Sequence, residues 1–405
     1  MTLTQRILAA LIAGLACGLL LTRFPDLAAR VTPVAELIGK AWVGGLRITI
    51  VPLVFALIVT GVASAADAAR AGGVAGRALL FIAIGLTGSA LVAGLVVEGL
   101  LAIWTVAPGA LGSLGMVSAM PAQATAITGD WLLSFIPVNP FKSAAEGEMV
   151  PLVAFALLFG FAATRIDGSR RVGLIGLFHG LTDTLMVIVH WVLRLAPIGV
   201  FALATVAGSR AGIAAAGTLA QYIAIVVCAC TAVTVLVYPV VRVASGVGIG
   251  RFARAVAPAQ AIACSTQSSI ASLPAMIDAT SGPLEIREPV RNVVLPMAVS
   301  IFRITSAAAN FAVALYVAAL HGIAIGPGLF VIGVIVATVV SLAAVGLPSQ
   351  VSFFTSIGPV CLAMGVPVEI LPLLLAVETI PDIFRTIGNV TADVALTLIV
   401  DRANT

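Results

Sequence analysis

The chain has 405 residues, of which 61% are hydrophobic and only 9% are charged, and its mean hydropathy is +1.18. Soluble domains carry about 25% charged residues, so this composition cannot cover a water-facing surface and indicates a polytopic membrane protein. The formal net charge is +4 without any run of Lys and Arg, which argues against a nucleic-acid partner. Five cysteines lie in apolar or small-residue stretches, and they predict neither a disulfide framework nor a metal cluster.

Apolar stretches follow one another along the chain, most of them about 20 residues long or longer, as a transmembrane helix requires. The first follows Arg6 and has no cleavage site opening onto a soluble domain, so we expect a helix and not a signal peptide. The expected spans are Ile7–Leu21, Ala41–Ala63, Ala78–Trp104, Met149–Ala163, Leu174–Val206, Thr218–Val241, Val290–Leu320 and Leu371–Val400, with a broken stretch over Gly328–Met364. The pattern predicts an all-α polytopic fold of eight transmembrane helices and two interrupted segments that do not cross.

Arginines are concentrated in alternate loops. The loops at Asp67–Arg77, Arg165–Arg171 and Arg242–Arg254 are basic, whereas Ala107–Asp130 has no Lys or Arg. The positive-inside rule therefore predicts cytoplasmic N- and C-termini in a multi-pass protein of the plasma (inner) membrane. Three basic residues after the first span argue the other way but are outnumbered.

Two stretches are ill suited to plain transmembrane helices. Ala263–Pro274 is rich in serine, and Ala343–Pro359 is apolar but interrupted by two glycines and two prolines. Unwound backbone at membrane depth persists only where protein or a water-lined cavity satisfies its amides, and paired interrupted segments indicate the binding site of a transporter. The alternative is ordinary helix packing, because serine, glycine and proline all occur in membrane helices.

The last span carries polar and ionisable residues at helical spacing. Glu378, Asp382, Arg385, Asn389 and Asp393 lie within an arc of about 80° on one helix. Charged groups are costly inside a membrane, so this stripe is expected to face a polar cavity or other buried polar groups. Arg385 can hold a carboxylate with two parallel hydrogen bonds, and Asp382 one turn earlier can receive an ammonium. This pair suits a zwitterion with an extra carboxylate, and the alternative is a salt-bridge stripe that only joins helices.

The preceding span adds Arg303, Ser306 and Asn310 on one helix face. Arg303 lies about 20 Å along the helix from Val290, which places its guanidinium deep in the membrane. A buried guanidinium requires a partner, and the acidic residues of the last span are its expected source.

Four motifs in a fixed order carry a resemblance to a known family. They are Ile136-Pro137-Val138-Asn139-Pro140-Phe141, Ala196-Pro197-Ile198-Gly199-Val200-Phe201, Ser268-Ser269-Ile-Ala-Ser272-Leu273-Pro274 and Asp382-Ile-Phe-Arg385-Thr386-Ile-Gly-Asn389-Val-Thr-Ala-Asp393. They are similar to motifs of the dicarboxylate/amino acid:cation symporters, which include glutamate and aspartate transporters. The resemblance covers most of the chain from about residue 40 onward.

The resemblance implies a single membrane domain over residues 1–405, assembled as a homotrimer in the lipid bilayer, with two re-entrant helical hairpins and inverted repeats. Scaffold helices would comprise about 5–70 and 130–207. A transport core would comprise about 74–105, 216–241 and 255–400 and would move as an elevator. Within that core, hairpin one would span 255–283, helix seven 290–320, hairpin two 327–362 and helix eight 368–400.

The resemblance also assigns roles to residues. Arg385 would hold the side-chain carboxylate of a small anionic or zwitterionic substrate, Asp382 would hold its amino group, and the first hairpin would cap its main carboxylate. The predicted substrate contacts are Asp382, Arg385, Thr386, Asn389, Ser268, Ser269, Ser306 and Leu347. The predicted cation or coupling residues are Asn389, Asp393, Glu378 and Arg303, with Asp393 as a sodium ligand beside Asn389.

Three departures from the family pattern bear on coupling. Where the family shows Asn-Met-Asp-Gly-Thr, an unwound sodium-binding turn, this chain has Phe302-Arg303-Ile304-Thr305-Ser306 and so loses an acid and gains a permanent cation. The second hairpin has Gly346-Leu347-Pro348-Ser349-Gln350-Val351 in place of Gly-Val-Pro-Gly-Ala-Gly, and the third helix offers Ala83-Ile-Gly-Leu-Thr87 in place of Tyr and Thr-Ser ligands. We therefore expect no cofactor and weak or no sodium dependence, with exchange or with proton coupling through Glu378 and Asp382.

The leading hypothesis is a secondary active transporter for an acidic amino acid or a dicarboxylate, with the Asp382–Arg385 pair favouring the amino acid. A sodium-coupled symporter of the same family is one alternative. A passive channel is another, although the polar residues cluster in the last third and trace no continuous pore. An intramembrane enzyme has little support, because His179 and His190 lie on a different predicted span from the polar stripe and the sequence has no His-Glu-x-x-His motif.

Overall fold

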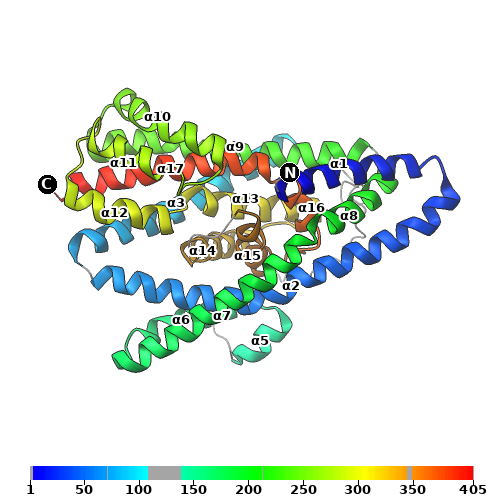
Figure 1. The fold of residues 1–405 in the computed structure, drawn as a ribbon, viewed down its shortest axis with the longest axis horizontal. Coiled ribbons are helices and arrows are strands. Elements are labelled where there is room, and N and C mark those ends of the chain that lie inside the picture. The colour runs from blue at the N-terminus through cyan, green and yellow to red at the C-terminus, as the bar shows by residue number, and fades with distance from the viewer. Residues whose placement is uncertain (1–2, 71, 108–137, 212, 344–348, 405) are drawn as a thin grey trace.

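A computed structural model describes residues 3–70, 72–107, 138–211, 213–343 and 349–404. In these ranges the secondary structure is entirely helical, which confirms the all-α prediction (Figure 1). The helices are α1 (Leu3–Leu21), α2 (Pro25–Arg70), α3 (Gly73–Ile103), α5 (Pro140–Glu146), α6 (Met149–Ala163), α7 (Gly168–Arg194), α8 (Ala196–Ala211), α9 (Ile213–Ser245), α10 (Ile249–Thr266), α11 (Leu273–Ser281), α12 (Glu288–Ile301), α13 (Ile304–Leu320), α14 (Pro327–Ala343), α15 (Ser349–Ala363), α16 (Leu371–Leu375) and α17 (Thr379–Arg402).

The described residues contain six segments that are long and apolar enough to cross a membrane. They are Pro25–Asp67, Gly73–Ile103, Gly168–Arg194, Ala215–Ser245, Glu288–Leu320 and Thr379–Arg402. These segments are those of a multi-pass membrane protein, whereas the count of eight crossing helices stays a prediction.

Three stretches expected to be single helices are divided, and a fourth is longer than expected. Leu174–Val206 separates into α7 and α8 at Leu195, just before Pro197 in the first turn of α8, a position where proline needs no backbone donor. Val290–Leu320 separates into α12 and α13, and Leu371–Val400 into α16 and α17. The expected span Ala41–Ala63 is the middle of the 46-residue helix α2.

Helices α1 and α8 pack side by side with their backbones unusually close. A Cβ atom on Gly18 would lie 2.3 Å from the Thr205 carbonyl oxygen, and one on Gly14 would lie 2.6 Å from the Phe201 carbonyl oxygen. Two glycines four residues apart leave one face of α1 without side chains, the arrangement by which membrane helices approach most closely. Gly14 lies beside Phe201 and Gly18 beside Thr205, so the two helices run parallel.

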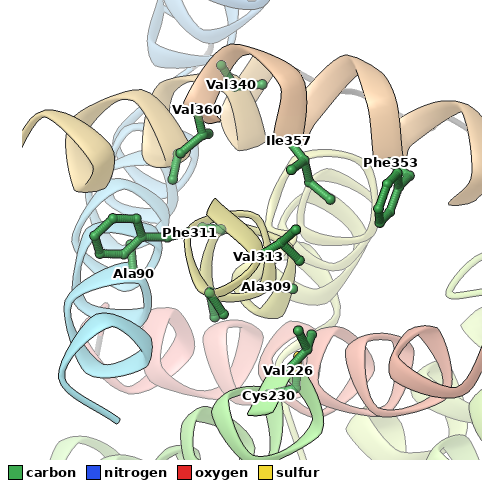
Figure 2. Close-up of a cluster of buried hydrophobic side chains, with 14 of the residues drawn as sticks. Ala90, Val226, Cys230, Ala309, Phe311, Val313, Val340, Phe353, Ile357 and Val360 are labelled. Carbon is green, nitrogen blue, oxygen red and sulfur yellow. The ribbon is translucent and has the colours of Figure 1, made fainter. Parts of the chain in front are cut away.

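Helix α13 forms the centre of the fold. Nearly all of its residues are buried, as expected for a helix that is apolar on every side. Figure 2 shows α13 with Val226 and Cys230 of α9 on one side, and Phe353, Ile357 and Val360 of α15 on the other. The Phe311 ring of α13 packs edge-on against Phe330 of α14, with ring centroids 5.0 Å apart. These neighbours fix the N-terminal end of α13, where the polar residues lie.

The serine-rich segment forms a helix–turn–helix. Helices α10 and α11 pack against each other and against α17, and they are joined by residues 267–272. Gln267 ends α10 with a φ of 53°, a left-handed conformation that reverses the chain direction. Helices α14 and α15 also pack together, and the residues joining them, including Gly346–Pro348, lie outside the described ranges. Entry of either pair into a membrane remains a prediction.

Candidate functional site

The site is organised around a break between α12 and α13. Phe302 has φ and ψ of −91° and 68°, and Arg303 has −92° and 67°, so both residues leave the helical conformation. The break falls within Phe302–Ser306, the stretch in which this chain departs from the family pattern. It exposes the first backbone amides of α13, which have no partner inside the helix and need acceptors from elsewhere.

Asn389 of α17 supplies one such acceptor. Its Oδ1 atom accepts a hydrogen bond of 3.0 Å from the backbone amide of Thr305 and one of 2.7 Å from the Thr305 hydroxyl. The same hydroxyl contacts the Arg385 carbonyl oxygen at 2.5 Å. All three residues are buried. Asn389 therefore joins the start of α13 to the middle of α17, and its amide oxygen is already engaged.

Glu378 and Arg385 form a buried ion pair. The Arg385 Nη2 and Glu378 Oε1 atoms are 2.7 Å apart, and the Tyr222 hydroxyl donates a 2.6 Å hydrogen bond to the other carboxylate oxygen. The Arg385 and Glu378 side chains are 1% and 5% exposed, so both charges depend on each other for compensation. Glu378 lies just before the first residue of α17, and Tyr222 belongs to α9. The pair fixes a guanidinium inside the protein.

Two further carboxylates lie on α17. Asp382 is buried one turn before Arg385, and its carbonyl oxygen accepts a 2.8 Å hydrogen bond from the Thr386 hydroxyl. Asp393 is 1% exposed, and among the described atoms neither of its carboxylate oxygens has a hydrogen-bond partner. Arg303 acts electrostatically on both acids. No described carboxylate lies within 4.0 Å of Arg303, so the contact ion pair expected from the sequence is not formed.

The turn between α10 and α11 lies beside the first residues of α17. The Gln267 side-chain amide donates a 3.2 Å hydrogen bond to the carbonyl oxygen of Thr379, next to Glu378. Ser268 and Ser269 follow in the turn and are half-buried, and the Ser268 hydroxyl accepts a bond from the Ala271 amide. The structure thus brings the predicted hairpin tip to the charged end of α17.

The remaining residues singled out in the sequence, Ser306, Asn310 and Leu347, make no described contact with the Glu378–Arg385 pair. Ser306 is buried on α13, and its hydroxyl has no hydrogen-bond partner among the described atoms. Asn310 on the same face donates a 3.2 Å hydrogen bond to the Ser341 hydroxyl of α14. Leu347 lies outside the described residues.

Three residues at the site escaped the sequence analysis. Tyr222 holds Glu378, Thr305 joins α13 to α17, and the Ser89 hydroxyl of α3 donates a 2.8 Å hydrogen bond to the Ile304 carbonyl at the break. Thr305 lies in Phe302–Ser306, the stretch that departs from the family pattern, so its position carried a signal. Tyr222 is one of only three tyrosines in the sequence, which is a weaker signal. Ser89 has no distinguishing sequence signal, because isolated serines are common in membrane helices.

The other side of the break is apolar. The ring of Phe302 covers Gly85 of α3, where an added Cβ would lie 2.8 Å from the ring. Next to it, α3, α9, α17 and the break line a pocket of about 370 Å³, whose walls are mostly apolar and include the hydroxyl side chain of Ser89. Among the described residues no three His, Cys, Asp or Glu side chains gather as metal ligands. The charged side chains of the site therefore lie outside this pocket.

Comparison with known proteins agrees with this arrangement. The chain is 27% identical to the proton/glutamate-aspartate symporter of Escherichia coli (strain K12) over 89% of its own length and 83% of that protein. It is 26% identical to a C4-dicarboxylate transport protein of Azorhizobium caulinodans, covering 98% and 88% of the two chains. It is 24% identical to the proton/sodium-glutamate symport protein of Bacillus subtilis (strain 168), covering 99% and 92%.

The match to a family is continuous over nearly the whole chain. The sequence profile of the sodium:dicarboxylate symporters matches residues 3–403, which includes both helix–helix pairs, the break and the charged end of α17. The burial of charged side chains such as Arg385 within membrane-length helices is also consistent with membership of a symporter family. The chain is thus a transport protein and not an enzyme, and it belongs to the sodium:dicarboxylate symporter family.

Proposed function

We propose that this protein is a secondary active transporter that moves an acidic amino acid, or a dicarboxylate, across the membrane. The observation that carries the proposal is the buried guanidinium of Arg385, which is 1% exposed and lies one turn from the carboxylate of Asp382. The similar proteins described above are named for glutamate, aspartate and C4-dicarboxylates, which supports the same class of substrate.

In this proposal the substrate binds between α17 and the turn of α10–α11. The Nε atom of Arg385 has no hydrogen-bond partner among the described atoms, so the guanidinium can still donate to a substrate carboxylate. Asp382 would receive the amino group, and the half-buried Ser268 and Ser269 would contact the main carboxylate. Thr386 would complete the pocket. The carboxylate of Asp382, one turn from Arg385, suits an amino group, which favours an amino acid over a plain dicarboxylate.

The transport movement would divide the chain into two parts. The scaffold would comprise residues 5–70 and 130–207, and the transport core would comprise residues 74–105, 216–241 and 255–400. The core would slide as an elevator within a homotrimer in the inner membrane, with both termini in the cytoplasm. The concentration of the buried charges in a single part of the chain supports this division, because the bound substrate would then travel with its ligands.

We further propose that sodium coupling is weak or absent. Arg303 places a permanent cation at the break, and the neighbouring positions Phe302, Ile304 and Gly85 offer no side-chain oxygen to a second cation. The amide oxygen of Asn389 is already held by Thr305. A ligand drives a conformational change only through differential affinity, so a cation without ligands cannot drive uptake. Exchange, or proton coupling through Glu378 and Asp382, would take its place.

A sodium-coupled symporter is the second candidate, and one observation favours it. Both carboxylate oxygens of Asp393 are buried without a hydrogen-bond partner among the described atoms, as the ligand of a transported cation would be.

The two candidates separate in a binding titration. Affinity for aspartate, glutamate and succinate is measured by calorimetry across sodium concentrations, with choline holding the ionic strength constant. We expect affinity to change little with sodium in the natural protein. The double substitution Arg303→Met with Ile304→Asp should introduce sodium dependence, whereas Ile304→Val, the control, should not. A steep sodium-dependent rise in the affinity of the natural protein would contradict the proposal.

A further inference from the structure

The surface between the proposed scaffold and the proposed transport core is mostly apolar and closely fitted. Helix α2 of the scaffold lies along α14 and α15 of the core (Figure 1). A Cβ atom on Gly61 would lie 2.9 Å from the Ala343 Cα atom, and one on Gly358 would lie 3.2 Å from the Ile50 side chain. Small residues and aliphatic side chains make no directional bonds, so such surfaces can slide past each other with little loss.

One ion pair crosses this surface. Arg47 of α2 contacts Glu369, which lies in the connection between α15 and α16. None of the other ion pairs found among the described side chains joins a residue of the scaffold ranges to a residue of the core ranges. The pairs within the scaffold are Lys40–Glu36, Lys142–Glu146 and Arg171–Asp67, and the pair within the core is Arg385–Glu378. In Arg210–Glu36, Arg251–Glu285 and Arg287–Asp401 one residue lies just outside the stated ranges.

Glu369 depends on this contact. Its Oε2 atom is buried without a hydrogen-bond partner in the described part of the chain, so Arg47 supplies the compensating charge for the carboxylate. The connection that carries Glu369 is short and leads through α16 to Glu378 and the charged end of α17. A displacement of the core along α2 would therefore separate Arg47 from Glu369 while leaving the pairs inside each part intact.

From these contacts we infer that Arg47 and Glu369 form a latch that favours the arrangement seen here over displaced positions of the core. The inference rests on the proposed division into scaffold and core. Both side chains are 44% exposed, which limits the strength of the pair. Pairs of this exposure shift an equilibrium by about two- to fivefold, enough to bias a moving part without locking it.

The test measures how often the present arrangement is populated. Cysteines replace Gly358 of the core and Ile50 of the scaffold, because a Cβ on Gly358 would lie 3.2 Å from the Ile50 side chain, and a short bifunctional thiol reagent joins them in a protein whose five natural cysteines are changed to serine or alanine. The rate of cross-linking in reconstituted vesicles is compared between variants. We expect Arg47→Gln and Glu369→Gln each to lower it about two- to fivefold. The combination of both should lower it no further, because they remove the same interaction.

Charge reversal supplies the second half of the test. Arg47→Glu combined with Glu369→Arg should restore the rate, and Asp67→Asn, which breaks a pair within the scaffold, should leave it unchanged. Equal rates in all variants, or additive effects of Arg47→Gln and Glu369→Gln, would overturn the latch. Absence of substrate exchange by the natural protein would instead refute the proposed transport, whatever the cross-linking shows.

Discussion

Arg385 has one structural role and one proposed role, and paired substitutions can separate them. It compensates the buried carboxylate of Glu378 at 2.7 Å, and it would bind the substrate carboxylate. Arg385→Gln removes one partner of a buried ion pair, which typically costs about 3–5 kcal/mol of unfolding free energy. It would also remove the two charge-assisted hydrogen bonds that Arg385 is proposed to make to the substrate, each worth about 1.5–3 kcal/mol. Together these bonds correspond to a weakening of the substrate Kd by at least about 100-fold.

The double substitution Glu378→Gln with Arg385→Gln tests each role by itself. Since both partners of the ion pair are neutralised together, thermal stability in detergent should return most of the way to that of the natural protein. Aspartate and glutamate affinity, measured by calorimetry, should stay lost. Glu378→Gln alone is the matched control and should retain binding, because the guanidinium remains. Binding of aspartate by the double variant with unchanged affinity would refute the assignment of Arg385 to the substrate.

Two further substitutions test the structure around the site. Tyr222→Phe removes the hydroxyl that donates to Glu378 and should lower the free energy of unfolding by about 1.5–3 kcal/mol. The Tyr316 hydroxyl donates to a neutral carbonyl, so Tyr316→Phe, the control, should cost only about 0.5–1.5 kcal/mol. Thermal unfolding that ranks the two variants in the reverse order would contradict the buried charge. Gly18→Val places atoms against the backbone of α8 and should abolish the monodisperse peak in size-exclusion chromatography. Gly44→Val, the control, places its side chain in open space and should be tolerated. Equal behaviour of the two variants would contradict the close α1–α8 packing.

The charged stripe on the last span was predictable because it follows from helical spacing and the cost of burying charge. The structure buries all five of its residues, as expected, but it adds that α17 is buried on its other sides as well. Composition could not show this, since an apolar side chain suits lipid and protein equally. Glu378 also lies in a turn before the helix and reaches Arg385 from there. Its role as a counter-ion therefore depends on a local break that spacing along one continuous helix does not describe.

The divisions of the expected spans show where local signals suffice and where they fail. The boundary between α7 and α8 lies beside Pro197, a residue that disfavours a continuous helix and that was present in a quoted motif. The break at Phe302 and Arg303 has no glycine or proline in it. It is held by partners far away in the sequence, since Asn389 caps the start of α13 and Ser89 binds the Ile304 carbonyl. Long-range contacts of this kind have no signature in the local sequence.

The charges around the break bear on what must accompany the substrate. Two guanidinium groups, Arg303 and Arg385, lie among three carboxylates, Glu378, Asp382 and Asp393, which leaves one net negative charge if all are ionised. The family pattern, with Met and Asp at positions 303 and 304, would leave three and could accept several cations. An acidic amino acid brings one further negative charge into this centre, where uncompensated charge is very costly. Two protons on the carboxylates would then balance the loaded core, and the permanent charge of Arg303 would take the place of a bound cation.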